Sequence, residues 1–231
     1  MTERLPREFF ARDVLDVAPE LLGCRLVHAG VTLRLTEVEA YAGEKGDPGS
    51  HAFRGKTPRT EVMFGPAGHL YVYFTYGMHF CANVVTGQAG LASAVLLRAG
   101  EVIRGHDLVA ARRPTVRQRD WARGPARLTV TMALGRPENG ADLCGPKPEP
   151  RIEPATETLA PERIRRGPRV GVSGPGGDES AYPWRFWIDG EPTVSAYRPG
   201  VVRPRRRATA VSPPTPPTRP GMPRSRGGCD A

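Results

Sequence analysis

The feature that most constrains this chain is the run from Val31 to Tyr41, whose side-chain pattern changes along its length. Side chains alternate in a strand, so six of them are predicted to share one face: Val31, Leu33, Leu35, Glu37, Glu39 and Tyr41. That face begins apolar and ends acidic and aromatic. A half-buried strand normally keeps its core face apolar, so the run predicts a strand whose end borders a pocket. The alternative is a strand that runs into solvent with two exposed glutamates.

The segments that follow favour the pocket. Gly43–Gly68 is long and broken by Gly and Pro, and a loop of this length in a compact domain is usually functional or disordered. It carries the basic side chains His51, Arg54, Lys56 and Arg59. Leu70–Asn83 then contains three of the six tyrosines. An acid beside an aromatic segment and a basic loop suits chemistry on a flat, anionic ligand, such as a nucleobase in DNA.

Composition indicates a soluble globular protein. The chain has 231 residues, of which 39% are hydrophobic and 25% charged, enough for one sizeable core. No apolar run approaches the roughly 20 residues of a membrane span, and Met1–Arg7 leads into no secretory signal. We therefore expect a cytoplasmic protein with no membrane partner. The four cysteines show no CxxC spacing and the five histidines no HExxH pattern, so no metal site is predicted.

Positive charge is concentrated at the C-terminal end. Residues 201–231 contain seven arginines and one acid, a net charge of +6 out of the +9 of the whole chain. This segment also holds seven prolines and no apolar periodicity, which predicts a disordered basic tail. Residues 1–17 are predicted to be a poorly packed lead-in anchored by Phe9 and Phe10, and residues 18–200 the catalytic domain. DNA binding by that domain must come from local clusters, with non-specific attraction added by the tail.

Local patterns predict the remaining elements. Cys24–His28 should form a hairpin with the central run, across a turn at Ala29 and Gly30. Further strands are predicted at Leu70–Phe74, Phe80–Val85, Ala92–Leu97, Arg169–Val172 and Trp184–Ile188. Helices are predicted at Ala18–Gly23, Glu101–Arg112 and Gly124–Gly135, with Pro125 in the first turn of the last. Pro146–Pro161 is predicted to be a connector.

Taken together, several separate motifs resemble the alkyladenine (3-methyladenine, methylpurine) DNA glycosylase family. They cover roughly Ala18 to Tyr197 and occur in the family's order: Thr36–Tyr41, Ser50-His51, Thr57–Arg59, Met63-Phe64, Leu70–Tyr73, Tyr76–Met78, Phe80–Asn83, Val95–Ala99, Gly124–Leu128, Arg169–Val172 and Arg185-Phe186. The resemblance implies a single mixed α/β (α+β) domain on a curved antiparallel sheet, with surrounding helices and a protruding β-hairpin. It also implies excision of alkylated or deaminated purines from double-stranded DNA, the first step of base excision repair, without a metal or organic cofactor. With such a substrate, we expect a monomer that is associated with the nucleoid through DNA.

The resemblance implies a role for each matching residue. Glu39 would be the general base that activates water for attack at C1′, and Arg98 would hold that water and orient Glu39. The base pocket would consist of Tyr41, His51, Met63, Tyr73 and Asn83, with Asn83 placed to clash with the amino group of guanine. Tyr76, with Met78 beside it, would fill the gap left by the flipped nucleotide. Arg59, Gly124 and Arg127 would contact the DNA backbone. No role for Glu37 follows from its chemistry.

Three other functions fit the sequence less well. A sugar glycosidase needs two carboxylates that flank its substrate, whereas Glu37 and Glu39 point from the same side. A lyase-type glycosylase needs a Schiff-base lysine, and only Lys45 and Lys56 lie near the motif. A non-catalytic DNA-binding module needs no acid facing the base, and such an acid would repel phosphates.

Overall fold

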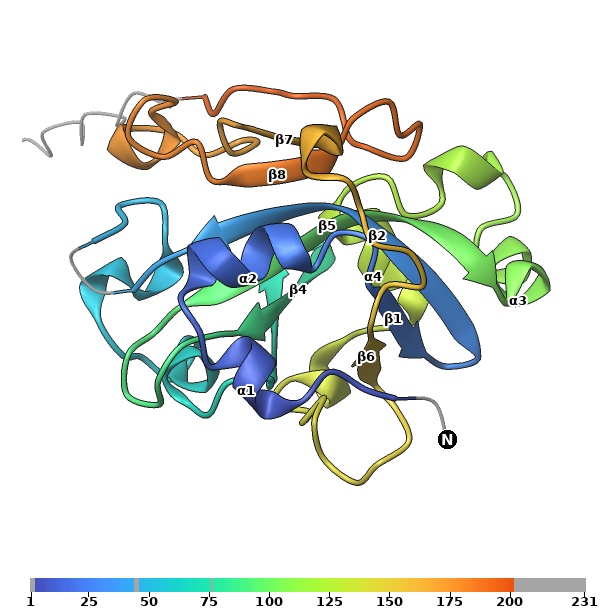
Figure 1. Ribbon diagram of the computed structural model, residues 1–231, viewed down its shortest axis with the longest axis horizontal. Coiled ribbons are helices and arrows are strands. Elements are labelled where there is room, and N and C mark those ends of the chain that lie inside the picture. The colour runs from blue at the N-terminus through green and yellow to red at the C-terminus, as the bar shows by residue number, and fades with distance from the viewer. Residues whose placement is uncertain (1–2, 44–45, 76, 202–231) are drawn as a thin grey trace, which may run out of the picture.

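The computed structural model describes residues 3–43, 46–75 and 77–201, and within them eight strands form one antiparallel sheet. The strands are β1 (Arg25–His28), β2 (Val31–Tyr41), β3 (Leu70–Thr75), β4 (His79–Val85), β5 (Ala94–Arg104), β6 (Arg151–Glu153), β7 (Ile164–Gly167) and β8 (Arg185–Ile188). The main order is β3-β4-β5-β2-β1-β6. Along one edge β2 pairs with β5, while its other edge carries β1 beside the first half and β8 beside the second. Figure 1 shows β7 and β8 above β2.

Four α-helices accompany the sheet in the described part of the chain: α1 (Arg7–Phe10), α2 (Val14–Glu20), α3 (His106–Arg112) and α4 (Pro125–Met132). The same residues include six short 3-10 helices, at His51–Arg54, Glu61–Phe64, Gln118–Asp120, Arg136–Glu138, Pro161–Arg163 and Pro175–Gly177. Both α2 and α4 contribute side chains to one large core that also contains Val38 and Ala40 of β2. The expected fold class, a mixed α+β domain on an antiparallel sheet, is confirmed.

The expected β-hairpin is formed by β3 and β4. Only Asn83–Val85 of β4 pair with β5, so the rest of the hairpin extends beyond the neighbouring strand. Gly77 has a φ of 68° and turns the chain at the tip. The side chains of Phe74 and Met78 are exposed there, Met78 by 70%. Tyr76, the predicted wedge, lies outside the described residues, as does nearly all of the predicted tail.

Two predicted helices were wrong in extent. Glu101–Arg104 continues β5 instead of beginning a helix, and only His106–Arg112 is helical. Pairing with β2 continues as far as Arg104, and this pairing outweighs the helical spacing of the apolar residues. Near the N-terminus, α2 begins at Val14 because Asp13 caps it: the Asp13 carboxylate accepts a hydrogen bond from the Leu15 amide at 2.8 Å. This cap was not predicted.

Two predicted non-helical segments also differ. Arg169–Val172 is not a strand, because the Arg169 side chain is buried in an ion pair and Gly171 adopts a φ of 73°; the strand of this region is β7, earlier in the chain. The Pro146–Pro161 connector contains β6, which pairs with β1. The lead-in packs more closely than expected, since Leu5 and Phe10 both belong to the core.

Candidate active site

Two β-bulges decide which way the acidic side chains of β2 point. One lies at Thr36 and the other, on the facing strand β5, at Arg98. Before the bulges, the odd-numbered residues of β2 face the core: Val31, Leu33 and Leu35. After them, the even-numbered residues Val38 and Ala40 do. Glu37, Glu39 and Tyr41 therefore lie on the opposite face of the sheet from Leu35. The prediction that all six side chains share one face was wrong, because a bulge inserts one residue and reverses the alternation that follows it.

This opposite face carries a cavity of about 520 Å³. Strand pairing aligns a row of residues across it: Tyr71, Asn83, Leu96, Glu39 and Arg185 face one another in turn on β3, β4, β5, β2 and β8. The loop after β2 closes one side with Ser50 and His51, and the segment from Val170 to Ser173 closes another. The cavity is thus a sheet surface enclosed by two loops, and the main core packs on the other side of the strands.

Glu39 lies fully buried at the base of this cavity. Its Oε2 accepts a hydrogen bond from the Tyr41 hydroxyl at 2.8 Å and lies 3.3 Å from a guanidinium nitrogen of Arg98. Its Oε1 accepts a hydrogen bond from the Val170 amide at 2.6 Å. All three partners line the cavity. The carboxylate is therefore fixed from three sides directly beneath the space that a ligand would enter.

A second buried carboxylate, that of Glu37, holds Arg98 in place. Its Oε1 accepts hydrogen bonds from Arg98 at 2.7 Å and Arg185 at 2.8 Å, and its Oε2 accepts one from the Ser195 amide at 2.7 Å. Burial alone would raise the pKa of Glu37, but the charges of Arg98 and Arg185 outweigh burial and lower it. The pKa of Arg98 is raised despite burial, because Glu39 and Glu37 stabilise its charge. Two carboxylates and two guanidiniums thus balance one another below the cavity.

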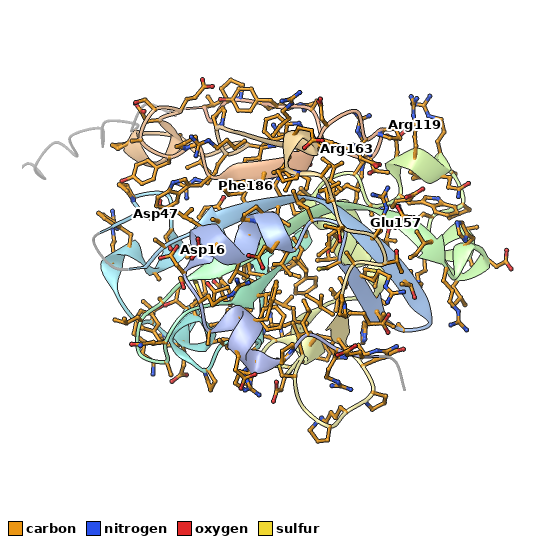
Figure 2. The ribbon with its side chains drawn as sticks, in the orientation of Figure 1. Asp16, Asp47, Arg119, Glu157, Arg163 and Phe186 are labelled. Atoms are coloured by element: carbon orange, nitrogen blue, oxygen red, sulfur yellow. The ribbon has the colours of Figure 1, made fainter. Side chains whose placement is uncertain are left out.

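A buried ion pair joins the two loops that enclose the cavity. Arg169 donates to both oxygens of Asp47, at 2.6 and 2.7 Å, and both side chains are fully buried. The Asp47 carboxylate also accepts hydrogen bonds from the amides of Ala42 and Gly49. The guanidinium of Arg169 lies 4.6 Å from the centre of the Tyr41 ring. Arg169 thereby holds the loop after β2, orients Tyr41 and places the adjacent Val170 amide against Glu39. Figure 2 labels Asp47 in this loop.

Aromatic side chains form another part of the cavity lining. The rings of Tyr71 and Tyr73 lie 5.4 Å apart, and the His51 ring meets Tyr73 edge-on at 4.5 Å. The guanidinium of Arg59 lies 5.2 Å from the centre of the Tyr73 ring. The His51 residue remains partly exposed, and partial desolvation by the surrounding protein and, secondarily, the charge of Arg59 lower its pKa to about 4. The imidazole is therefore neutral at pH 7, and it presents an uncharged polar edge beside the aromatic rings.

Most of the predicted site residues come together. Tyr41, His51, Met63, Tyr73, Asn83 and Arg98 all line the cavity, with Glu39 beneath them. Asn83 donates a hydrogen bond to the Tyr71 carbonyl at 3.0 Å, which fixes its amide. Gly124 caps the start of α4, whose first residue Pro125 reaches the cavity, and the exposed Arg127 follows. Met78 lies apart from these residues, at the tip of the hairpin.

Several contributors were missed as site residues. Tyr71 lines the cavity together with Tyr73, a pairing that alternation along β3 could have indicated. Asp47, Arg169, Arg185 and Ser195 were also missed, because their roles depend on partners more than 100 residues away: Arg169 lies 122 residues from Asp47, and Arg185 lies 148 residues from Glu37. Short-range spacing carries no signal for such pairs.

The described residues contain no group of three or more His, Cys, Asp or Glu side chains that could hold a metal ion. In the same part of the chain, no helix combines the length and apolar character needed to span a membrane. Cys24, Cys81 and Cys144 are free thiols.

Comparison with known proteins places this geometry in a family. The family model for methylpurine-DNA glycosylase (MPG) matches residues 8–192. A relative from Streptomyces avermitilis is 54% identical over 89% of this chain and 96% of its own length. A relative from Leifsonia xyli is 52% identical over 83% of this chain and 92% of its own length. Both carry the name "Putative 3-methyladenine DNA glycosylase". The chain belongs to the methylpurine-DNA glycosylase family.

Proposed function

We propose that this protein is a monofunctional DNA glycosylase that flips a damaged purine out of duplex DNA and hydrolyses its N-glycosidic bond, leaving an abasic site. The observation that carries the proposal is the fully buried Glu39 carboxylate, held by three donors under an aromatic cavity. Family membership supports the same reaction class.

The aromatic lining suits a flipped purine. Stacking on Tyr41 and Tyr73 accepts any base, because every base has a π-face, and contributes about 1–3 kcal/mol per base. An alkylated purine that carries a positive charge gains a cation–π attraction that a normal base lacks. Asn83 adds selection, since its fixed amide would clash with the exocyclic amino group of guanine.

The carboxylate of Glu39 performs the chemistry in this proposal. It accepts a proton from a water molecule as the water attacks C1′, while the purine departs with the bonding electrons. The sugar develops oxocarbenium character in the transition state, and the negative charge of Glu39 stabilises it. Arg98 orients both the carboxylate and the water. Lys56, the described lysine nearest the motif, pairs with Glu61 at 3.1 Å and does not line the cavity above Glu39, which supports hydrolysis over Schiff-base chemistry.

Flipping leaves a gap in the duplex, and the hairpin tip is the element proposed to fill it. The exposed apolar side chains of Phe74 and Met78 flank the tip, where Tyr76 would enter the gap. Apolar insertion offsets part of the few kcal/mol that unstacking costs.

The test is base release from a duplex containing one ethenoadenine or hypoxanthine, in the presence of a chelator. Wild type should release the base, and Glu39→Gln should be slower by about 10²–10⁴-fold, because a general base is lost while the side-chain shape is kept. Lesion binding by Glu39→Gln should persist. Release at the wild-type rate by the variant would refute the role of Glu39, and binding without release by wild type would indicate a damage-binding module.

A further inference from the structure

Residues 193–200, which follow β8, contact the active site from the surface of the molecule. Figure 1 shows them at the top of the view, near the end of the coloured chain. They form neither helix nor strand, and residues 196–199 are exposed. The family model ends at residue 192, just before this segment. We call residues 193–200 the strap.

Ser195 of the strap binds three buried charged side chains at once. Its amide and its hydroxyl both donate to the Glu37 carboxylate, at 2.7 and 2.9 Å. The same hydroxyl accepts a hydrogen bond from Arg98 at 3.2 Å, and the Ser195 carbonyl accepts one from Arg185 at 2.7 Å. Every polar group of this residue therefore holds one of the charges around Arg98.

Contacts at the start of the strap fix it to the body of the protein. Thr193 is buried, and its hydroxyl lies 2.9 Å from that of Thr36 in the bulge of β2. Arg123 donates through Nε to the Val194 carbonyl at 2.8 Å. The carboxylate of Asp120 faces Arg123 and three other arginines, so positive charge is in local excess beside this contact. The strap is thus bound both to the bulge and to the segment before α4.

The far end of the strap holds the loop whose Val170 amide donates to Glu39. The amide of the next residue in that loop donates to the Arg198 carbonyl at 2.8 Å. Gly200 packs so closely on Val172 that an added Cβ would clash with the backbone there. The position of the loop therefore depends on the strap.

The strap also borders a second cavity, of about 340 Å³, that adjoins the first. Arg98 and Val170 line both cavities, and Ala196 and Arg198 line only the second. The two residues at the boundary are those that the strap holds, and both contact the Glu39 carboxylate. The strap thus reaches Glu39 from two sides through intermediate groups.

We propose that the strap is a positioning element for the hydrolysis and that the Ser195 hydroxyl is its most important group. This hydroxyl sets the position of the Arg98 guanidinium, and with it the position of the attacking water. The far end of the strap sets the Val170 amide. No residue of the strap lines the first cavity, so it acts through these two partners. The inference rests on the proposed glycosylase function and extends the site beyond the residues that the family model matches.

The experiment measures single-turnover release of ethenoadenine or hypoxanthine over a series of enzyme concentrations. Ser195→Ala removes the two hydrogen bonds of the hydroxyl and keeps those of the amide and the carbonyl. Its maximal rate should fall about tenfold, because a hydrogen bond to a charged group is worth about that factor or more. The half-saturating enzyme concentration should stay at the wild-type value, since the base cavity is unchanged. Ser195→Thr keeps a hydroxyl and should recover most of the rate.

The matched control is Ser93→Ala. The Ser93 hydroxyl also makes two hydrogen bonds, both with Thr86, at 2.8 and 2.9 Å, and it lines neither cavity. Thermal denaturation should show a similar loss of stability in both alanine variants, but Ser93→Ala should keep the wild-type maximal rate. A wild-type maximal rate in Ser195→Ala, or an equal decrease in Ser93→Ala, would overturn the proposal.

Gly200→Ala tests the far end of the strap. The clash with the backbone of Val172 should displace the loop that holds Glu39 and lower the maximal rate, whereas Gly135→Ala, whose added Cβ would meet no atom closer than 3.7 Å, should not. Equal rates in these two variants would remove the far end from the proposal. If wild type releases neither base, the glycosylase function itself fails. Release by wild type with an unaffected Ser195→Ala contradicts only the role of the strap.

Discussion

Glu37 and Glu39 stand two residues apart on the same face of β2, yet their surroundings differ. Glu37 is surrounded by Arg98, Arg185 and Ser195 and lines neither cavity. Glu39 is held by groups that themselves line the first cavity. Glu37 therefore positions Arg98, while Glu39 is the carboxylate next to the ligand space. The structure supplies in this way the role that chemistry alone could not assign to Glu37.

Replacing Glu37 with glutamine should therefore destabilise the protein. Glu37→Gln removes the carboxylate partner of Arg185 and one of the two carboxylates beside Arg98, and breaking a buried pair in this way costs about 3–5 kcal/mol. Urea denaturation measures the free energy of unfolding. The control is Glu101→Gln, which removes a half-exposed partner of Arg34 and should cost at most about 1 kcal/mol. Equal losses in the two variants would contradict the assignment of Glu37.

His51 should make stability depend on pH. Its pKa is about 4 in the folded protein, below the ordinary value of 6.5, so the unfolded chain binds a proton first as the pH falls. The stabilisation is complete above about pH 6.5 and is lost progressively toward pH 4. His51→Gln should therefore show a flatter decline in unfolding free energy as the pH falls from about 6.5 to about 5. Parallel curves for wild type and variant would exclude this linkage.

At the scale of elements, the paired bulges of β2 and β5 place the site. Each strand has one extra residue, Thr36 on β2 and Arg98 on β5, so the pairing register is the same before and after the two bulges. In each strand, however, the side chains that follow the extra residue point to the opposite face from the one that regular alternation would give them. Arg98 is thereby brought to the face that carries Glu37 and Glu39. Close approach of the strands just before the bulge depends on Gly100, which pairs with Leu35.

Gly100→Ala should therefore destabilise the sheet at the bulge. An added Cβ would clash with the Leu33 side chain and lie 2.5 Å from the Arg34 carbonyl oxygen. Because that oxygen belongs to the backbone of a paired strand, it cannot move away without disturbing the sheet. Overpacking of this kind costs about 1–3 kcal/mol, to be measured by chemical denaturation. Gly135→Ala is the matched control, because its nearest atom would be 3.7 Å away. Equal free energies of unfolding for the two alanine variants would show that the close approach of the strands at position 100 does not require glycine.

On the scale of the whole molecule, charge is divided between two regions. Residues 1–200 carry +3 and residues 201–231 carry +6. The larger share thus lies in a segment almost entirely outside the described residues. The local excess around Asp120 lies within the folded part, next to the site. We expect the first region to bind DNA specifically and the second to add attraction that depends on salt.

Removal of residues 202–231 should therefore weaken DNA binding most at low ionic strength. The slope of log K against log salt should become shallower by about 0.9 for each phosphate that the arginines of this segment neutralise. Fluorescence anisotropy over a salt series measures this slope. Base release at saturating enzyme should be unchanged, because all the residues of the cavity are retained. An unchanged slope would show that the segment does not bind DNA.

The sequence by itself determined the elements whose signals are local. The strand at Val31–Tyr41, the β3–β4 hairpin and the proline at the start of α4 were all confirmed, because such patterns act over a few residues. Residues of the family motifs, among them Tyr41, His51 and Tyr73, also line one cavity. Only the tertiary structure decided which face carries the acids, because strand pairing, not local propensity, creates a bulge. It likewise decided that Asp47 pairs with Arg169 and Glu37 with Arg185. A buried charge needs an opposite charge next to it, and the folding of the chain brings that partner from a distant part of the sequence.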